Sequence, residues 1–365
     1  MPTFRELKGS RCASGRRANP KTKSSLETFR ACGSPGCRGD NAMKLLRRQF
    51  LRLAASAAAL PAASRVAHAL DYPVRPVHIV VSFAPGIAPD IVARIIGPSL
   101  SDRLGQQVIV DNRPGVAGNI GTAFAARALP DGHTLLVVVS NNTINATLYR
   151  KLDFNFAHDF APVGSIGATS FVMAVTPALP AKTVPEFITY AKANPGRINM
   201  GSSGVGSAPH VSGELFKMMT GVDFLHVPYR GNYMADLLNG KVQLGFPPIA
   251  QAIEFVRDGR LHALAVTTST RAHALPDVPS IREFVPGYEA AGWYGICVPA
   301  GTPDVIVEKL NAEIAAVIGD PKVSDRLLAM GVEPHAMARA EFRKFIADDI
   351  EKWAKVIKFA GISPE

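Results

Sequence analysis

Residues 77–94 constrain the fold of this chain more than any other stretch. Val77–Phe83 is a nearly continuous apolar run rich in β-branched residues, which is typical of a strand buried on both faces. Pro85-Gly86 then breaks the strand, and a helix is predicted to begin at Pro89 or Asp90. One side of this helix carries three isoleucines, Ile91, Ile95 and Ile96. A helix that begins here leaves backbone N–H groups free at the C-terminal edge of a sheet, where open α/β sheets bind anions.

Strand-like and helix-like segments alternate along most of the chain, which favours an α/β fold with a largely parallel sheet. A length of 365 residues favours two domains. We expect the chain to cross between them first within Phe160–Val175, with residues 70–168 plus 296–365 in one lobe and residues 169–295 in the other. Two α/β domains joined by two crossings are typical of a hinged clamshell that holds its ligand between the lobes.

Two predictions concern the C-terminal helices. Thr302 is expected to cap a helix that has Pro303 as its first residue. A last helix is expected over Arg339–Phe359, with an apolar stripe that packs in the core. Its acidic residues are assigned to a solvated face: Asp348, Asp349 and Glu351.

Residues 43–69 have the pattern of an export signal. A basic segment with the twin arginines Arg47 and Arg48 precedes an apolar run, and Ala67-His68-Ala69 has the small-x-small form of a cleavage site. We therefore expect a periplasmic protein, exported by the twin-arginine route and cleaved near Ala69. Residues 1–42 are interpreted as a disordered extension that results from a start codon assigned too early.

This leader dominates the charge of the chain. The formal net charge of +10 falls to −1 when residues 1–69 are excluded. The remainder has no basic block for phosphate binding, so nucleic acid is not expected as a partner. Cys297 is then the one cysteine left, which excludes an internal disulfide, and it is interpreted as a buried packing residue. The histidines lack metal-ligand spacing, and we expect neither a metal nor a cofactor.

Enzyme signatures are weak in this sequence. The loop Gly201–Gly206 lacks the order of a dinucleotide-binding or P-loop motif. Ser203 and His210 remain as an alternative nucleophile and base, although no G-x-S-x-G turn surrounds Ser203. Free N–H groups at helix starts bind carboxylates through hydrogen bonds and helix dipoles. Such strand, polar turn and helix-start patterns occur at 83–90, 140–143, 202–208 and 229–231.

A series of spaced motifs covers the chain from about Asp71 to its C-terminus. They are YPVRPV at 72–77, FAPG at 83–86, NRPG at 112–115, PDGHTL at 130–135, DFAPV at 159–163, HVPYRG at 226–231, LAVT at 264–267 and PAGTP at 299–303. In this order they resemble the Bug family, the TctC-like extracytoplasmic receptors of tripartite tricarboxylate transporters.

The resemblance implies a type II periplasmic-binding-protein fold, whose two lobes close on a di- or tricarboxylate, an amino acid or an aromatic acid. The turn before the first helix would supply N–H groups to one carboxylate, and three other loops would approach from the remaining sides. The candidate ligand-binding residues are Phe83, Ala84, Pro85, Gly86, Ile87, Asp90, Ser140, Asn141, Ser202, Ser203, Gly204, His210, Tyr229, Arg230 and Gly231.

Four of these positions raise specific questions. Asp90 either complements the helix dipole or contacts the ligand, and we favour both together. Arg230 either contacts the ligand or lies on the surface. Ile87 stands where the family usually has glycine, and its branched side chain narrows the turn. The segment after Gly231 is shorter than usual, and Tyr233 is expected to reach inward instead.

These observations together predict a soluble, monomeric receptor rather than an enzyme. It would deliver a small carboxylate to the membrane subunits of a tripartite tricarboxylate transporter. Ligand sensing, with the closed form contacting a sensor kinase, is the alternative.

Overall fold

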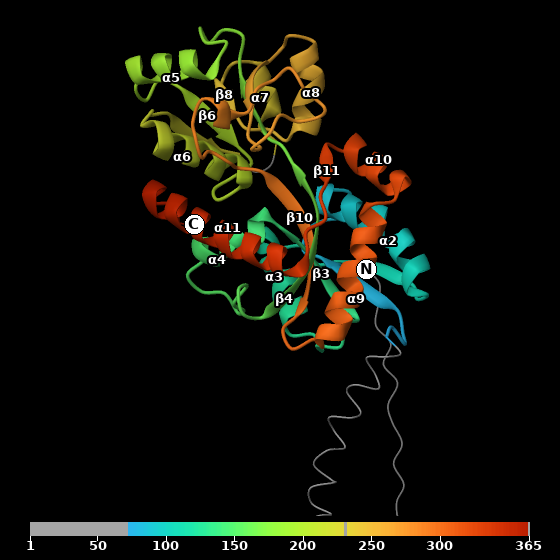
Figure 1. Cartoon of the computed structure of the whole chain (residues 1–365). Coiled ribbons are helices and arrows are strands. Elements are labelled where there is room, and N and C mark those ends of the chain that lie inside the picture. Colours follow the sequence, from blue (N-terminus) through green and yellow to red (C-terminus); the bar gives the residue numbers. More distant parts are fainter. Residues whose placement is uncertain (1–71, 230–231, 364–365) are drawn as a thin grey trace, which may run out of the picture. The chain divides into compact units, whose positions relative to one another are not determined.

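The computed structural model describes residues 72–229 and 232–363, which form two β-sheets with helices packed around them (Figure 1). The larger sheet contains β1 (Val77–Val81), β2 (Val108–Asn112), β3 (Thr134–Val139), β4 (Phe160–Thr169), β10 (Gly292–Pro299) and β11 (Val332–Pro334). The smaller sheet contains β5 (Val172–Val175), β6 (Asn199–Ser202), β7 (Leu225–Pro228), β8 (Leu244–Gly245) and β9 (His262–Val266). Both sheets belong to one unit of the chain. The predicted export signal and the extension before it lie outside the described residues.

Both sheets are mixed, so the expectation of a largely parallel sheet is wrong. The strand orders are β11-β4-β10-β3-β1-β2 and β7-β6-β8-β5-β9. In the larger sheet β1 runs parallel to β2 and β3, whereas β10 is antiparallel to β3 and β4. In the smaller sheet β6 runs parallel to β7 and β8, whereas β5 is antiparallel to β8 and β9. The chain passes from β4 to β5 with no helix between them, and from β9 to β10 through a connection that contains a short 3-10 helix (Ile281–Glu283). Neither connection is a strand-helix-strand crossover, the kind that keeps successive strands of one sheet parallel.

Helices cover both faces of the larger sheet (Figure 1). The helices of this region are α2 (Ala88–Leu104), α3 (Asn119–Ala126), α4 (Ser140–Leu148), α9 (Asp304–Ile318), α10 (Pro321–Ala329) and α11 (Arg339–Ala360). Along β1, Ile79 and Val81 face a core shared with α2, α9 and α10, while Val80 faces a core shared with α3 and α11. The prediction of a strand buried on both faces is therefore confirmed. Cys297 of β10 is buried in the second of these cores, as expected for a packing residue.

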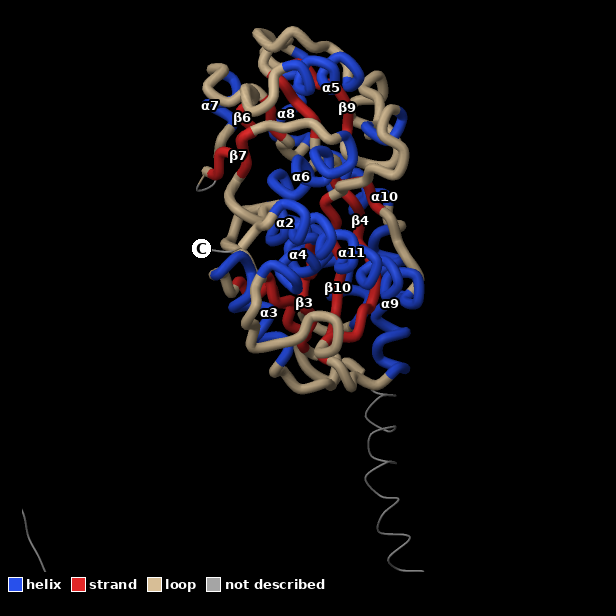
Figure 2. Tube along the Cα trace, turned by 90° about the vertical axis from the view of Figure 1, so that its left-hand side faces the viewer, coloured by secondary structure: helices blue, strands red, loops and turns tan. Residues whose placement is uncertain are grey.

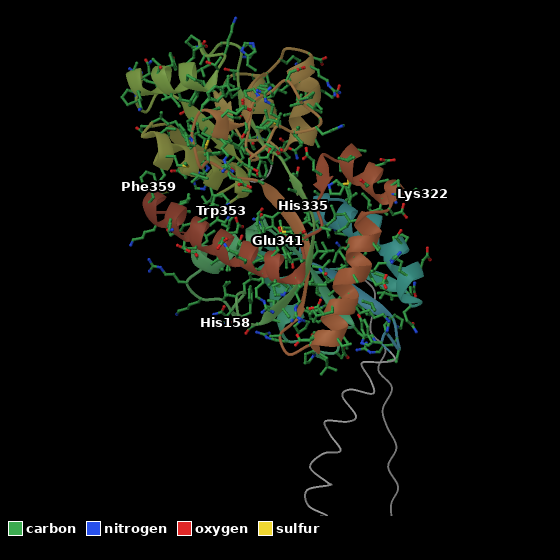
Figure 3. The ribbon with its side chains drawn as sticks, in the orientation of Figure 1. His158, Lys322, His335, Glu341, Trp353 and Phe359 are labelled. Atoms are coloured by element: carbon green, nitrogen blue, oxygen red, sulfur yellow. The ribbon has the colours of Figure 1, made fainter. Side chains whose placement is uncertain are left out.

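The core of the smaller sheet includes two helices that also contact the larger one. The remaining α-helices are α5 (Val184–Ala193), α6 (Ala208–Thr220), α7 (Met234–Leu238) and α8 (Ile249–Arg257). Ile144 and Leu148 of α4 pack in the same core as α5 and α6. Trp353 and Val356, in the second half of α11, also belong to this core, and Figures 2 and 3 show that half of α11 next to α6. Phe342 in the first half packs on the larger sheet, so α11 serves both cores.

The structure corrects two predictions about the C-terminal helices. Pro303 is the N-cap of α9 rather than its first residue, and the Thr302 hydroxyl donates to the Pro299 carbonyl oxygen at 2.7 Å instead of capping the helix. Asp349 is only 3% exposed, although it was assigned to a solvated face. It accepts hydrogen bonds from Thr143 and Trp293, which makes it a buried link between α11, α4 and β10.

Candidate functional site

A cavity of about 750 Å³ is the candidate functional site, lined by strands of the larger sheet and by helix starts and loops that adjoin both sheets. Its walls include the first residues of α2, α4, α6 and α8, together with residues of β10. A groove of about 790 Å³ along α3 is lined from the larger-sheet region alone. Because ligand sites occur preferentially where two domains meet, the first cavity is the stronger candidate.

Four helix N-termini converge on this cavity. Ala88, Ser140, Ala208 and Ala250 lie in the first turns of α2, α4, α6 and α8, and all four line it. N–H groups in a first helical turn lack the usual intrahelical partner, and the helix dipole places partial positive charge at the same point. Pro89 and Pro209 have no N–H, and the N–H of Ile249 already donates to the Ser170 carbonyl oxygen. The cavity therefore offers hydrogen-bond donors and positive potential from several directions.

None of the described residues that line the cavity carries a formal charge. Its polar side chains are those of Ser140, Asn141, Asn145, Thr169, Ser203, Ser207 and Gln251, besides the hydroxyl of Tyr294. Its larger apolar side chains are those of Phe83, Ile87, Ile91, Leu148, Phe171, Val205, Trp293 and Met330. An anionic group placed here would be held by backbone dipoles and neutral donors instead of a lysine or an arginine.

Asn145 lines the cavity, and two contacts hold its side-chain amide in place. Its Nδ2 donates to the carbonyl oxygen of Ala117 at 2.9 Å and to Oδ1 of Asn119 at 3.0 Å. The carbonyl oxygen of Ala117 can only accept, so this contact fixes the orientation of the Asn145 amide. Oδ1 of Asn145 is buried and has no partner among the described residues.

The turn before α2 is held by Asp90, which is 2% exposed. Its carboxylate accepts from the N–H of Gly86 at 2.8 Å, from Nε of Arg94 at 3.0 Å and from Nδ2 of Asn112 at 2.9 Å. Burial on its own would raise the pKa of Asp90. The hydrogen bonds from Arg94, Gly86 and Asn112, with the charge of Arg94, outweigh burial and lower this pKa. Asp90 is therefore ionised at neutral pH and fixes the turn that presents Ile87 and Ala88 to the cavity.

The loop before α6 is held by neutral groups instead. The Ser202 hydroxyl lies 2.6 Å from Nε2 of His226, and Nδ1 of His210 accepts from the N–H of Gly206 at 3.0 Å. The two imidazole rings stack with their centroids 3.5 Å apart. Burial lowers the pKa of His210 to about 3, helped by the nearby His226 and Lys217. Burial, and then Lys217, lowers the pKa of His226 to about 4, so both rings are neutral at pH 7.

The structure brings six of the predicted site residues to the cavity. These are Phe83, Ile87, Ser140, Asn141, Ser203 and Gly204. The residues placed behind or beside the lining are Ala84, Pro85, Gly86, Asp90, Ser202, His210 and Tyr229. Arg230 and Gly231 lie outside the described residues. Ile91 also lines the cavity and is 37% exposed, whereas Ile95 and Ile96 of the same helix are buried in the core.

Two tyrosines are placed differently from the prediction. The Tyr229 hydroxyl donates to Oδ2 of Asp236 at 2.8 Å, so it braces α7. Tyr233 does not reach into the cavity, because its ring is buried against β6 and β8. A Cβ atom at Gly201 would lie 2.8 Å from this ring, and one at Gly245 would lie 2.7 Å from it. The glycines of these two strands thus make room for Tyr233 in the core.

Ser203 and His210 are not placed as a nucleophile and base. Ser203 is exposed at the cavity, while His210 is 4% exposed and bonds the N–H of Gly206. The serine that does contact a histidine is Ser202, which is fully buried and out of reach of a substrate. Among the described residues, no group of three or more His, Cys, Asp or Glu side chains is placed to hold a metal ion. In the same part of the chain, no helix is long and apolar enough to cross a membrane.

Several lining residues were missed by the sequence reasoning. Trp293 and Tyr294 come from an apolar run in β10 that reads only as core, and Asn145 lies inside a helix. Ala250 and Gln251 follow Pro247-Pro248 at the end of β8. That last segment has the same strand, turn and helix-start pattern as the four predicted sites. The pattern could therefore have predicted a fifth site at the start of α8.

A family model described as "Tripartite tricarboxylate transporter family receptor" (TctC) matches residues 92–362. Protein BugT of Bordetella pertussis is 34% identical over 295 residues, which cover 80% of this chain and 90% of BugT. A UPF0065 protein from the tcbD-tcbE intergenic region of Pseudomonas sp. strain P51 is 35% identical over 310 residues, which cover 84% of this chain and 92% of that protein.

Solved structures show the same architecture. Rpa4515 of R. palustris with adipate has 36% identity and a TM-score of 0.69, over 80% of this chain and 100% of that chain. The periplasmic binding protein BugD has 31% identity and a TM-score of 0.66, over 80% of this chain and 100% of that chain. MatC (Rpa3494) from Rhodopseudomonas palustris with bound malate has 31% identity and a TM-score of 0.65, over 78% of this chain and 100% of that chain.

Proposed function

Because this chain belongs to the tripartite tricarboxylate transporter family of receptors, the TctC or Bug family, we propose that it captures a small carboxylate in the cavity between its two sheets. Members of this family are periplasmic solute-binding proteins, and the two-sheet α/β architecture is their type II binding-protein fold. The chain accordingly acts as a receptor of this family.

One observation carries the proposal of a carboxylate ligand. Four helix N-termini meet at a cavity whose described lining has no charged side chain. This combination stabilises an anion through N–H donors and dipoles. The ligands of two solved relatives, adipate and malate, are both carboxylates, which supports the same class here.

The first turns of α2 and α4 would bind the carboxylate from the larger-sheet side, and those of α6 and α8 from the smaller-sheet side. Of the residues that the sequence nominated, Ser140, Asn141 and Ser203 would donate side-chain hydrogen bonds. Gly86 and Asp90 would act through the turn, and His210 through the loop before α6.

In this proposal, residues 70–168 plus 296–365 form one lobe and residues 169–295 the other. The links β4 to β5 and β9 to β10 would act as the hinge. The protein is exported with cleavage near Ala69 and presents its closed form to the membrane subunits of a tripartite tricarboxylate transporter.

A thermal-shift screen tests the ligand class. The purified protein is heated with succinate, malate, glutarate, adipate or benzoate, each at millimolar concentration. An acid present at 100 times its Kd adds about 2.7 kcal/mol to the free energy of unfolding, which raises Tm by several degrees. If no acid of the panel raises Tm, the proposal fails.

A variant at the start of α4 tests the location. Asn141→Asp places a carboxylate beside the predicted anion site, and we expect it to weaken binding of the active acid at least tenfold, about 1.4 kcal/mol. Asn239→Asp makes the same change at an exposed position outside the cavity and should leave binding unchanged. Equal affinity in both variants would place the ligand elsewhere.

A further inference from the structure

The groove along α3 has an apolar lining and a basic rim, and it shares no lining residue with the candidate ligand cavity. Its volume is about 790 Å³, and it is lined by residues of 113–128 and of 149–154. Resting on the proposed function, we propose that the α3 groove docks an acidic, apolar segment of the membrane subunits of the transporter. The partner then sits on the larger-sheet region of the receptor.

The apolar side chains that line the α3 groove are exposed. Val116, Ile120 and Phe124 are 58%, 52% and 41% exposed, although each is a large apolar residue. Ile120 and Phe124 are four residues apart in α3, so they lie on the same face of this helix. An apolar face of this kind, rimmed by polar residues, is typical of a surface that a partner covers.

The backbone just before α3 is strained at a residue that lines the groove. Val116 has φ +47°, a conformation that β-branched residues rarely adopt. Burial does not compensate this strain, since the Val116 side chain is more than half exposed. Strained backbone persists most often at binding and switch regions, and a docking role for the groove accounts for it here.

The charged side chains at the rim favour an acidic partner. Arg113, Arg127 and Lys151 line the groove, and Asp153 is the one carboxylate among its described lining residues. Three cations and one carboxylate give this lining a net charge of +2, whereas residues 70–365 together carry −1. Arg127 and Asp153 form an exposed ion pair at 3.3 Å, which contributes little to stability and can open for a partner.

Nearby charges outside the lining leave this balance unchanged. Asp111 pairs with Arg113 at 2.8 Å, while the exposed Arg150 adds one positive charge beside the groove. Cζ of Arg113 also lies 3.5 Å from the centroid of the Phe124 ring, a cation–π contact. The basic rim and the apolar lining are therefore continuous, and a segment that carries carboxylates beside apolar side chains complements both.

The α3 groove and the ligand cavity share a wall. Val116 lines the groove, and Ala117, the next residue, lines the cavity. Asn119 also lines the groove, and its Oδ1 accepts from Nδ2 of Asn145, which lines the cavity. A partner seated in the groove therefore contacts residues whose immediate neighbours face the ligand. This location suits a partner that must distinguish the loaded receptor from the empty one.

Two other occupants fit the groove less well. A second copy bound through the same face about a two-fold axis would bring two basic rims together, and like charges repel. A bilayer surface takes up apolar side chains that project outward, whereas Val116, Ile120 and Phe124 line a hollow. Charge and shape together favour an acidic segment of a protein.

Uptake by cells tests the groove with matched variants. A strain without its own copy of the gene receives the unmodified receptor or Val116→Asp, and uptake of the acid found in the thermal-shift screen is measured. We expect Val116→Asp to lower uptake at least tenfold, because a carboxylate replaces apolar surface where an acidic segment docks. Val305→Asp makes the same change at a residue of α9 that is 53% exposed and lines neither the groove nor the cavity, so uptake should stay unchanged.

Measurements on the purified protein separate docking from folding and ligand binding. Aspartate adopts positive φ more readily than valine, so Val116→Asp should keep the Tm of the unmodified protein. Its calorimetric Kd for the acid should stay within twofold, because Val116 does not line the cavity. Full uptake with Val116→Asp overturns the proposal and leaves ligand capture standing.

A charge reversal decides the result if Val116→Asp changes the Kd or the Tm. Lys151→Glu acts at the rim, and we expect it to lower uptake at least threefold with an unchanged Kd. Lys322→Glu makes the same change at an exposed residue of α10 and should leave uptake unchanged (Figure 3). Equal uptake with these two variants would overturn the docking assignment.

A crosslink identifies the occupant. Ile120 is replaced by p-benzoylphenylalanine, and the cells are irradiated with an epitope tag on the membrane subunits that the same uptake requires. A crosslink to a tagged subunit supports the proposal, whereas a crosslink only to a second copy, only to lipid or to nothing overturns it. If loss of the receptor gene leaves uptake unchanged, the delivery role fails and the docking proposal fails with it, while calorimetric binding of the acid still supports capture.

Discussion

The turn before α2 and the loop before α6 deliver helix starts to the same cavity, but different chemistry holds each in place. In the turn, one buried carboxylate collects a backbone N–H, a guanidinium and an amide. In the loop, a serine, two stacked histidines and backbone groups form a network without formal charge at pH 7. A helix start can thus be kept open for a ligand by a charged anchor or by a neutral one.

The two anchors lose their contribution to stability over different pH ranges. The pKa of Asp90 is lowered in the folded state, so its contribution to stability is full above its ordinary value and is lost only as the pH falls through the lowered pKa. His210 and His226 resist protonation when folded, so the unfolded chain binds protons first as the pH falls below about 6.5. Mild acid therefore weakens the loop while the turn stays intact.

Substitution of Asp90, the charged anchor of the turn, is expected to cause the largest loss of stability. Asp90→Asn leaves donors of Arg94 and Gly86 without a good acceptor, and we expect a loss of about 2–3 kcal/mol in the free energy of unfolding. Urea unfolding measures the change. Asp102→Asn, an exposed position of the same helix, should stay within about 0.5 kcal/mol of the unmodified protein. Equal effects of the two substitutions would show that Asp90 does not anchor the turn.

Substitution of one glycine in each segment is expected to lower stability more in the loop before α6 than in the turn before α2. Gly206 has φ +73°, and a Cβ atom there would lie 2.2 Å from Leu148 of α4, so Gly206→Ala adds overpacking to backbone strain and should cost about 2–3 kcal/mol. Gly86 has φ +83° with no atom within 4 Å of such a Cβ, so Gly86→Ala should cost only about 1 kcal/mol of strain. Thermal unfolding of both variants gives the order, and a reversed order would contradict the packing of the loop against α4.

The adjacent residues Ser202 and Ser203 are expected to have different roles, one in stability and the other in ligand binding. Ser202→Ala removes the hydroxyl bonded to His226 and to Gly204 and should lower the unfolding free energy by about 1–2 kcal/mol. Ser203→Ala removes an exposed hydroxyl at the cavity and should change stability by less than about 0.5 kcal/mol while weakening ligand binding. Chemical denaturation and titration of the active acid measure the two effects. If Ser203→Ala lowered stability and Ser202→Ala did not, Ser203 and not Ser202 would hold the loop in place.

The slope of stability against pH gives the smallest expected signal. Between pH 6.5 and about 4, the unfolded chain binds up to one more proton than the folded chain at each of His210 and His226, so stability falls as the pH falls. In His226→Gln the slope should decrease by up to one proton, whatever the change in stability at pH 7. Urea unfolding at several pH values measures it, and an unchanged slope would mean that His226 takes up its proton over the same pH range in the folded and unfolded chains.

Local patterns predicted the part of the site that lies next to β1. A β-branched run, a Pro-Gly break and a helix start are all encoded within residues 77–94, and the structure has them in that order as β1, a turn and α2. The starts of α4 and α6 follow the same local logic. Sequence reasoning succeeded here because each feature depends on neighbours in the chain.

Other features depend on contacts between distant segments and escaped prediction. Trp293 lines the cavity because β10 runs antiparallel between β3 and β4, and nothing in an apolar run shows that direction. Asp349 looks like one of several acids on a polar face until Thr143 and Trp293 meet it from elsewhere in the fold. Tyr233 is drawn into the core by the space above Gly201 and Gly245, which only strand pairing creates.

The last helix has a consequence for the order of folding events. Phe342 and Ile346 of α11 complete the core on one face of the larger sheet, while Trp353, Val356 and Ile357 complete the core beneath the smaller one. Neither core can close until these residues have emerged from the ribosome. The nascent polypeptide therefore exposes apolar surface of both cores through most of its synthesis.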